Sequence, residues 1–136
     1  MFCTRFSFIL FILLKTTFGY SQALQRQDTI KMICREWKFK VAHSDNFDDN
    51  SQEAKDFIKY TRFLFKSNMS YTYKDDGWEE THKWKYNSSK KEIILEEDDG
   101  SKMILKIISL SSSMLKIESR DPDTNVFASG TLVPAK

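Results

Sequence analysis

Apolar and polar residues alternate in short runs from Arg62 to Val133, and short polar turns separate these runs. Alternation with a period of two residues predicts half-buried β-strands. Met69, Tyr71 and Tyr73 show the pattern, because each is followed by a polar residue. Turns this short leave no room for a crossover helix, so consecutive strands are expected to pair antiparallel.

One more strand precedes this region, because Trp37, Phe39 and Val41 share one parity. The pattern therefore predicts eight strands, at residues 33–41, 62–66, 69–74, 83–86, 92–96, 103–108, 115–118 and 126–133. Eight antiparallel strands in up-and-down order close into a small barrel. The fold class that we predict is all-β.

The long connection between the first two strands is acidic and amide-rich from His43 to Glu53. Ser51 is a typical N-cap residue, and Ala54, Phe57 and Tyr60 follow it at helical spacing. We expect one short helix in this loop.

The N-terminus has the features of a secretory signal peptide. Met1–Arg5 is basic, Phe6–Leu14 is apolar, and small residues follow at Gly19, Ser21 and Ala23. An apolar run this short does not span a bilayer, which needs about 20 residues. We predict a signal peptide at residues 1–21 (cleavage as late as 23), a leader at 22–32, a barrel domain at 33–133, and a secreted or periplasmic protein. An uncleaved anchor is the alternative.

Charge and cysteine content reduce the number of possible partners and roles. Without Arg5 and Lys15, the 21 basic residues fall to 19, which equals the 19 acidic residues. A neutral chain gives no electrostatic reason to expect nucleic acid or an anionic membrane as a partner. Cys34 is then the one remaining cysteine, because Cys3 lies in the signal, so no internal disulfide is expected. A half-buried inert thiol is favoured over a redox role.

Three segments carry a family resemblance: Ile33–Phe39, Trp84–Tyr86 with Glu92–Leu95, and Ile107–Ser111 with Met114–Ile117. On these segments the chain resembles the lipocalin-like proteins, in particular small exported bacterial lipocalin-like domains. The resemblance implies an antiparallel barrel in which a binding cavity is an optional feature. Arg35 stands where that family has a glycine, and residues 126–133 hold no Arg or Lys to cover Trp37.

Aromatic residues are the main functional lead, because they lie on strand parities that all face one way. A barrel interior lined by such rings would accept an apolar ligand, although a core filled by its own side chains is the favoured alternative. The predicted ligand-binding residues are Trp37, Phe39, Phe63, Phe65, Tyr71, Tyr73, His82, Trp84 and Tyr86. Trp78 follows a turn, where we expect it to cover the open end rather than to form an exposed platform.

No catalytic residue, metal ligand or cofactor is predicted. One loop gathers an imidazole and three carboxylates, from His43, Asp45, Asp48 and Asp49. Their spacing does not match an EF-hand, so a solvated acidic loop is expected. His82 shares its parity with Trp84 and is expected to be a satisfied interior histidine. It remains the residue to test for activity.

These features favour a monomeric, non-enzymatic barrel that binds a small apolar or amphipathic ligand behind a gate formed by residues 43–60. The alternative is a cell-surface interaction or structural module with a side-chain-filled barrel. Ile94, Ile104 and Ile108 favour that alternative, since their parity places an apolar patch on the outer face, where a protein partner would bind. The other option is that the helix around Ala54–Tyr60 covers this patch, which would favour the ligand-binding barrel instead.

Overall fold

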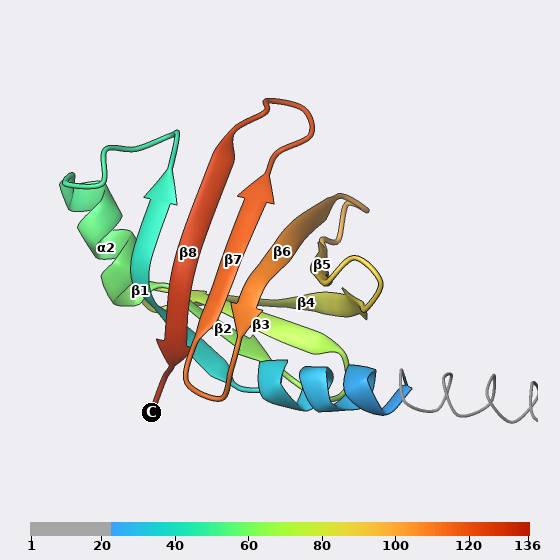
Figure 1. Cartoon of the computed structure of the whole chain (residues 1–136). Helices are drawn as coiled ribbons and strands as arrows, with labels where there is room; N and C mark the ends of the chain where they lie inside the picture. Colours follow the sequence, from blue (N-terminus) through green and yellow to red (C-terminus); the bar gives the residue numbers. More distant parts are fainter. Residues whose placement is uncertain (1–22) are drawn as a thin grey trace, which may run out of the picture. The chain divides into compact units, whose positions relative to one another are not determined.

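The computed structural model describes residues 23–136, and residues 32–136 contain a closed antiparallel barrel (Figure 1). The barrel has eight strands, each paired with its neighbours in sequence. They are β1 (Glu36–Ser44), β2 (Arg62–Phe65), β3 (Ser70–Asp75), β4 (Trp78–Asn87), β5 (Glu92–Glu96), β6 (Lys102–Leu110), β7 (Leu115–Arg120) and β8 (Phe127–Pro134). The predicted eight-stranded up-and-down barrel is confirmed. The predicted signal peptide lies outside the described residues.

Closure depends on β8, which pairs with β7 on one side and with β1 on the other. Thr131, for example, lies opposite Val41 in β1 and opposite Lys116 in β7. Two of the strand limits differ clearly from the expected ones. β1 begins at Glu36 rather than at residue 33, and β4 extends back to Trp78, five residues before the expected start at 83.

The helix α2 (Gln52–Tyr60) forms where the sequence predicted it. Ser51 is its N-cap, and the Ser51 hydroxyl accepts a hydrogen bond of 3.1 Å from the backbone N–H of Ala54. Phe57 packs against Phe39 of β1 with ring centroids 5.0 Å apart. α2 lies beside β1 and also contacts β3 (Figure 1). It therefore does not cover the outer patch on β5 and β6, and the expected role of this helix as its cover is wrong.

Residues 23–33 are also helical, where the sequence analysis expected only a leader. Ile33 at the end of this segment is fully buried although it precedes the first strand. No helix of the described part of the chain has the length and apolar character needed to cross a membrane.

Trp37 anchors the end of the barrel at which β1 begins. Its side chain is fully buried, and its indole N–H donates a hydrogen bond of 2.9 Å to the carbonyl of Ile33. The Arg35 guanidinium lies 5.4 Å from the centroid of the Trp37 ring and donates a 2.6 Å hydrogen bond to the carbonyl of Ser112 in the β6–β7 turn. Arg35 thus covers Trp37 at this end, where residues 126–133 offer no Arg or Lys to do so.

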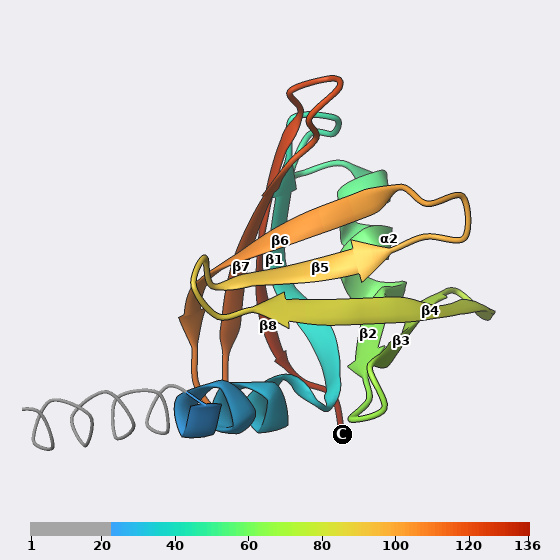
Figure 2. The ribbon, with the colours of Figure 1, turned by 90° about the vertical axis from the view of Figure 1, so that its right-hand side faces the viewer.

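The opposite end carries α2 and the β3–β4, β5–β6 and β7–β8 turns, because the strands alternate in direction. We call it the open end. Figure 2 shows the β3–β4 and β5–β6 turns projecting on the same side of the barrel. The candidate site lies below these two turns.

Candidate functional site

An aromatic wall lines the inner face of β1 to β4. Its rings follow one another from strand to strand: centroids are 5.9 Å apart for Phe39 and Phe63, 6.0 Å for Phe63 and Phe65, and 5.2 Å for Phe65 and Trp84. Tyr71 and Tyr73 join the wall through Phe65 and Phe63, at 6.1 and 5.5 Å. Several of these pairs meet edge to face, the favoured geometry for aromatic rings.

The wall is almost completely buried. Phe65 and Tyr71 are each 2% exposed, and Trp84 is not exposed at all. Tyr73 is the half-buried member. Burial raises the pKa of the Tyr73 hydroxyl, which lies near the hydroxyl of Thr61. The wall is therefore closed by its own side chains except near Tyr73.

Thr61 lies at the end of α2, directly before β2, and is fully buried. Among the described residues its hydroxyl has no hydrogen-bond partner. A buried hydroxyl without a partner costs about 1–3 kcal/mol. Within the described part of the chain, this hydroxyl is the one buried polar side-chain group without a partner.

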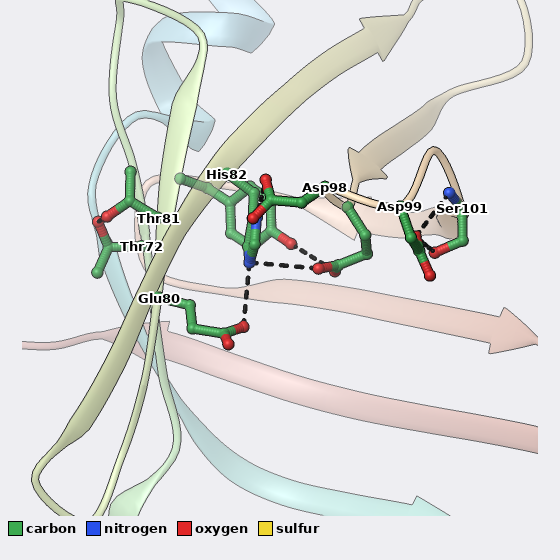
Figure 3. A network of polar contacts seen from close by, with 9 residues as sticks. Thr72, Glu80, Thr81, His82, Asp98, Asp99 and Ser101 are labelled. Carbon is green, nitrogen blue, oxygen red and sulfur yellow. Dashed lines mark hydrogen bonds and ion pairs between the residues drawn. The ribbon is translucent and has the colours of Figure 1, made fainter.

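A polar cluster continues the inner face of β4 beyond the aromatic wall (Figure 3). We call it the His82 cluster and define it as Glu80, His82, Glu97 and Asp98. The His82 Nε2 atom lies 3.0 Å from Glu80 Oε2 and 3.3 Å from Glu97 Oε2, and the other ring nitrogen lies 3.2 Å from Asp98 Oδ1. Tyr71 donates a 2.9 Å hydrogen bond to Glu97 Oε1, which joins the cluster to the aromatic wall.

Strand register explains why these groups meet. His82 pairs with Tyr71 across β3 and β4, and Glu80 pairs with Tyr73, so all four side chains share the inner face. Glu97 and Asp98 come from the turn that follows β5, next to β4. Only 8% of the His82 side chain is exposed.

The carboxylates of the cluster shift the pKa values of His82 and Tyr71. The hydrogen bond to Glu80 raises the pKa of His82; burial opposes this rise, and Asp98 and Glu97 add to it. The pKa of Tyr71 is raised well above its ordinary value, first by burial and then by the hydrogen bond to Glu97. Tyr71 therefore remains a hydrogen-bond donor at neutral pH.

The structure brings seven of the nine predicted ligand residues into one continuous set of ring contacts: Phe39, Phe63, Phe65, Tyr71, Tyr73, His82 and Trp84. Trp37 and Tyr86 are buried as well but make none of these ring contacts. Whether any of the nine contacts a ligand stays a prediction.

Trp78 differs from its expected role as a cover of the open end. It begins β4, is 54% exposed, and meets Tyr73 edge to face at 6.1 Å. It lines a groove of about 340 Å³ with Tyr60, Arg62 and Lys74. A second groove, of about 180 Å³, includes Val41 and lies over β1, β6, β7 and β8. No residue of the aromatic wall lines either groove.

The acidic loop of β1 and α2 holds a simpler arrangement than the His82 cluster. His43 Nδ1 lies 2.9 Å from Asp49, and the Nε2 atom lies 3.9 Å from Asp45. The side chain of His43 is 46% exposed. The expected solvated loop agrees with this exposure.

Sequence reasoning missed Thr61, Glu80 and Glu97 as site residues. The parity of Glu80 with His82 and Trp84 was a usable signal, because side chains two residues apart on a strand share a face. Glu97 had no such signal, since its position depends on how β5 pairs with β4.

The fold is that of a lipocalin-like barrel: eight antiparallel strands closed on themselves, with a short helix after the first. Among solved structures, the chain is similar to bovine odorant-binding protein in complex with a selenium-containing odorant. The TM-score is 0.50 and the identity 14%, over 79% of this chain and 73% of the other. A deswapped triple mutant of bovine odorant-binding protein gives a TM-score of 0.50 and 12% identity, over 76% and 74%. No family model and no curated protein matches the sequence.

Proposed function

We propose that this protein binds a small apolar or amphipathic molecule inside its barrel and that it is not an enzyme. The aromatic wall carries the proposal, because it is a continuous apolar surface on the inner face of a closed barrel. Rings of this kind offer a large contact area, and a few polar groups beside them orient a ligand.

The half-buried side of the wall is the proposed place of entry. Tyr73 is the least buried ring of the wall, and the unpaired hydroxyl of Thr61 lies beside it. A ligand that places its apolar part on Tyr73 and Phe63 would bring a polar group within reach of Thr61. This arrangement favours an amphipathic ligand over a pure hydrocarbon.

The insertion between β1 and β2 is the proposed gate. Phe57 of α2 contacts both Phe39 of the wall and Phe47 of the loop, at 5.0 and 6.1 Å. Movement of α2 would therefore uncover Phe39. The bovine neighbour of similar fold was solved with an odorant bound, which supports a barrel of this kind as a binder of small molecules.

We further propose that the protein is exported, on the basis of the apolar segment Phe6–Leu14 and the small residues that follow it. The mature protein would then meet its ligand outside the cytoplasm, as a monomer.

The outer face supports a second candidate function, as an interaction module. Met103, Ile104 and Ile108 of β6 are 48, 46 and 49% exposed, and α2 packs mainly against β1 and β3. An exposed apolar patch of this kind fits a protein partner. In that case the barrel core would serve only to stabilise the fold.

Titration of the purified full chain with a fluorescent amphiphile tests the first function against the second. We expect one binding site per chain, with Tyr73→Ala weakening the affinity about fivefold because one aromatic contact is worth about 1 kcal/mol. Ile104→Thr on the outer face is the matched control and should bind like wild type. Absence of binding to wild type, or an equal loss in Ile104→Thr, contradicts the pocket assignment.

A further inference from the structure

We propose that Glu80, His82 and Glu97 form a site for a divalent transition-metal ion at the open end of the barrel, with Asp98 and Tyr71 as positioning residues. One ligand atom from each of the first three side chains lies within 4.8 Å of the other two. This site does not depend on the proposed apolar ligand, because it uses different side chains from Tyr73 and Thr61.

The spacing of the three ligand atoms suits a small ion. Zinc lies about 2.1 Å from nitrogen and oxygen ligands, so two ligands of a tetrahedral zinc ion are about 3.4 Å apart. The His82 Nε2 atom is 3.0 Å from Glu80 Oε2 and 3.3 Å from Glu97 Oε2. The ion would thus be held after small adjustments of the side chains and would keep a coordination position for water or a ligand.

The surroundings of the three side chains match those of a metal site. Metal-binding histidines commonly donate their second ring N–H to a carboxylate, which fixes the ring and its tautomer. Asp98 Oδ1 lies 3.2 Å from Nδ1 of His82 and can accept that hydrogen bond, which leaves Nε2 free to bind the ion. Tyr71 similarly donates to Oε1 of Glu97, and Oε2 is the atom that faces His82.

The charge of the cluster also calls for a cation. Glu80, Glu97 and Asp98 bring three carboxylates to one imidazole, so even a protonated His82 leaves an excess of negative charge. Within residues 23–136, no lysine or arginine forms an ion pair with these carboxylates; Lys85, for example, pairs with Glu96. One nitrogen and two oxygen ligands favour a borderline ion such as zinc over calcium or magnesium.

Isothermal titration of the metal-stripped full chain with zinc chloride tests the site. We expect one zinc ion per chain. His82→Ala and Glu97→Gln should weaken the affinity at least thirtyfold, and Asp98→Asn about tenfold, in the range seen for residues that orient a metal ligand. His43→Ala is the matched control, since His43 also contacts carboxylates but is not among the three clustered ligands. It should bind zinc like wild type.

Glu80→Gln is a second variant that tests the site in a folded protein, because Glu80 is exposed and its side chain is not part of the core. Cobalt in place of zinc adds a spectroscopic check: its visible absorption should report a nitrogen and oxygen environment in wild type and disappear in His82→Ala. Absence of zinc binding to wild type, unchanged affinity in Glu80→Gln and His82→Ala, or an equal loss in His43→Ala overturns the proposal. In that event His82 is a protonated partner of the carboxylates and nothing more.

Discussion

Gly130 determines how closely β8 approaches the aromatic wall. It lies between Ala42 of β1 and Ile117 of β7, and a Cβ atom added there would come within 2.5 Å of the Phe39 ring atom Cε1. The ring of Phe39 thus occupies the space that a side chain at position 130 would need. Glycine is required here for this close approach and not for an unusual backbone angle.

Gly130→Ala is therefore expected to destabilise the barrel by about 1–3 kcal/mol, because the Phe39 ring must leave its packed position. Urea unfolding followed by tryptophan fluorescence measures the change. Ala128→Gly, on the same strand, is a control for the general effect of glycine in β8. If Gly130→Ala is as stable as wild type, Phe39 has room to move and the wall is less tightly packed than the structure indicates.

Arg35 covers Trp37 from a position directly before β1, where the lipocalin-like pattern has a glycine. The missing glycine at this position and the missing basic residue in β8 looked like two separate departures from the lipocalin-like pattern. The structure links them, because the guanidinium of Arg35 covers Trp37 at 5.4 Å. The sequence alone did not suggest this, because no pattern in it links Arg35 to Trp37 or to the β6–β7 turn.

At the level of elements, α2 depends on its N-cap. The Ser51 hydroxyl accepts the hydrogen bond from Ala54 N–H, one of the N–H groups that a first helical turn leaves without a partner. The same helix positions Phe57 on Phe39. A weaker cap should therefore affect both the stability of the loop and access to the wall.

Ser51→Ala is expected to cost about 1 kcal/mol, as measured by chemical unfolding. Ser67→Ala, at an exposed turn position, is the control and should unfold like wild type. If α2 is the gate, stopped-flow mixing with the fluorescent amphiphile should also show faster association in Ser51→Ala. If Ser51→Ala is less stable than wild type but associates with the amphiphile at the same rate, α2 does not control ligand entry.

The strands and α2 were predictable because their signals are local. Alternation located most of the strands, and the pair of Ser51 with the apolar stripe located the helix. β4 was predicted too short because its first residues, Trp78 to His82, do not alternate between apolar and polar. The inner face carries the charged Glu80 there, so the period of two residues is hidden. Helix 23–33 was missed because its middle, residues 25–29, is polar and interrupts any apolar stripe.

The candidate site was less predictable than the fold. Parity alone placed the aromatic residues and His82 on the inner face. The His82 cluster, however, needs the β4–β5 register and the turn conformation that brings Glu97 to His82, and no local pattern encodes either. The unpaired hydroxyl of Thr61 likewise becomes visible only when its surroundings are known.

At the scale of the whole molecule, the barrel separates an apolar interior from a charged mouth. One end is closed by Trp37, Ile33 and Arg35, and the other carries α2 and the His82 cluster. A fold of this class hosts many functions, so the fold does not identify the ligand. The side chains at the open end are what would distinguish this barrel from others of its class.

Closure of the barrel predicts which backbone amides of β8 are protected from exchange with solvent. In a strand with two neighbours, successive backbone N–H groups point alternately to one neighbour and to the other, and both sets are hydrogen-bonded. β8 pairs with β1 and with β7, so the amides of Thr131 and Leu132 should both be protected. In an open sheet β8 would be an edge strand, and every second amide would face solvent.

Hydrogen exchange of the full chain, followed residue by residue by NMR, distinguishes these two cases. We expect slow exchange at consecutive amides of β8 from Gly130 to Val133, with opening free energies close to that of global unfolding. β3, which pairs with β2 and β4, provides an internal reference for full protection. Fast exchange at alternate β8 amides would show that the β1–β8 pairing opens readily in solution, and a ligand would then have a route into the barrel between these two strands rather than past α2.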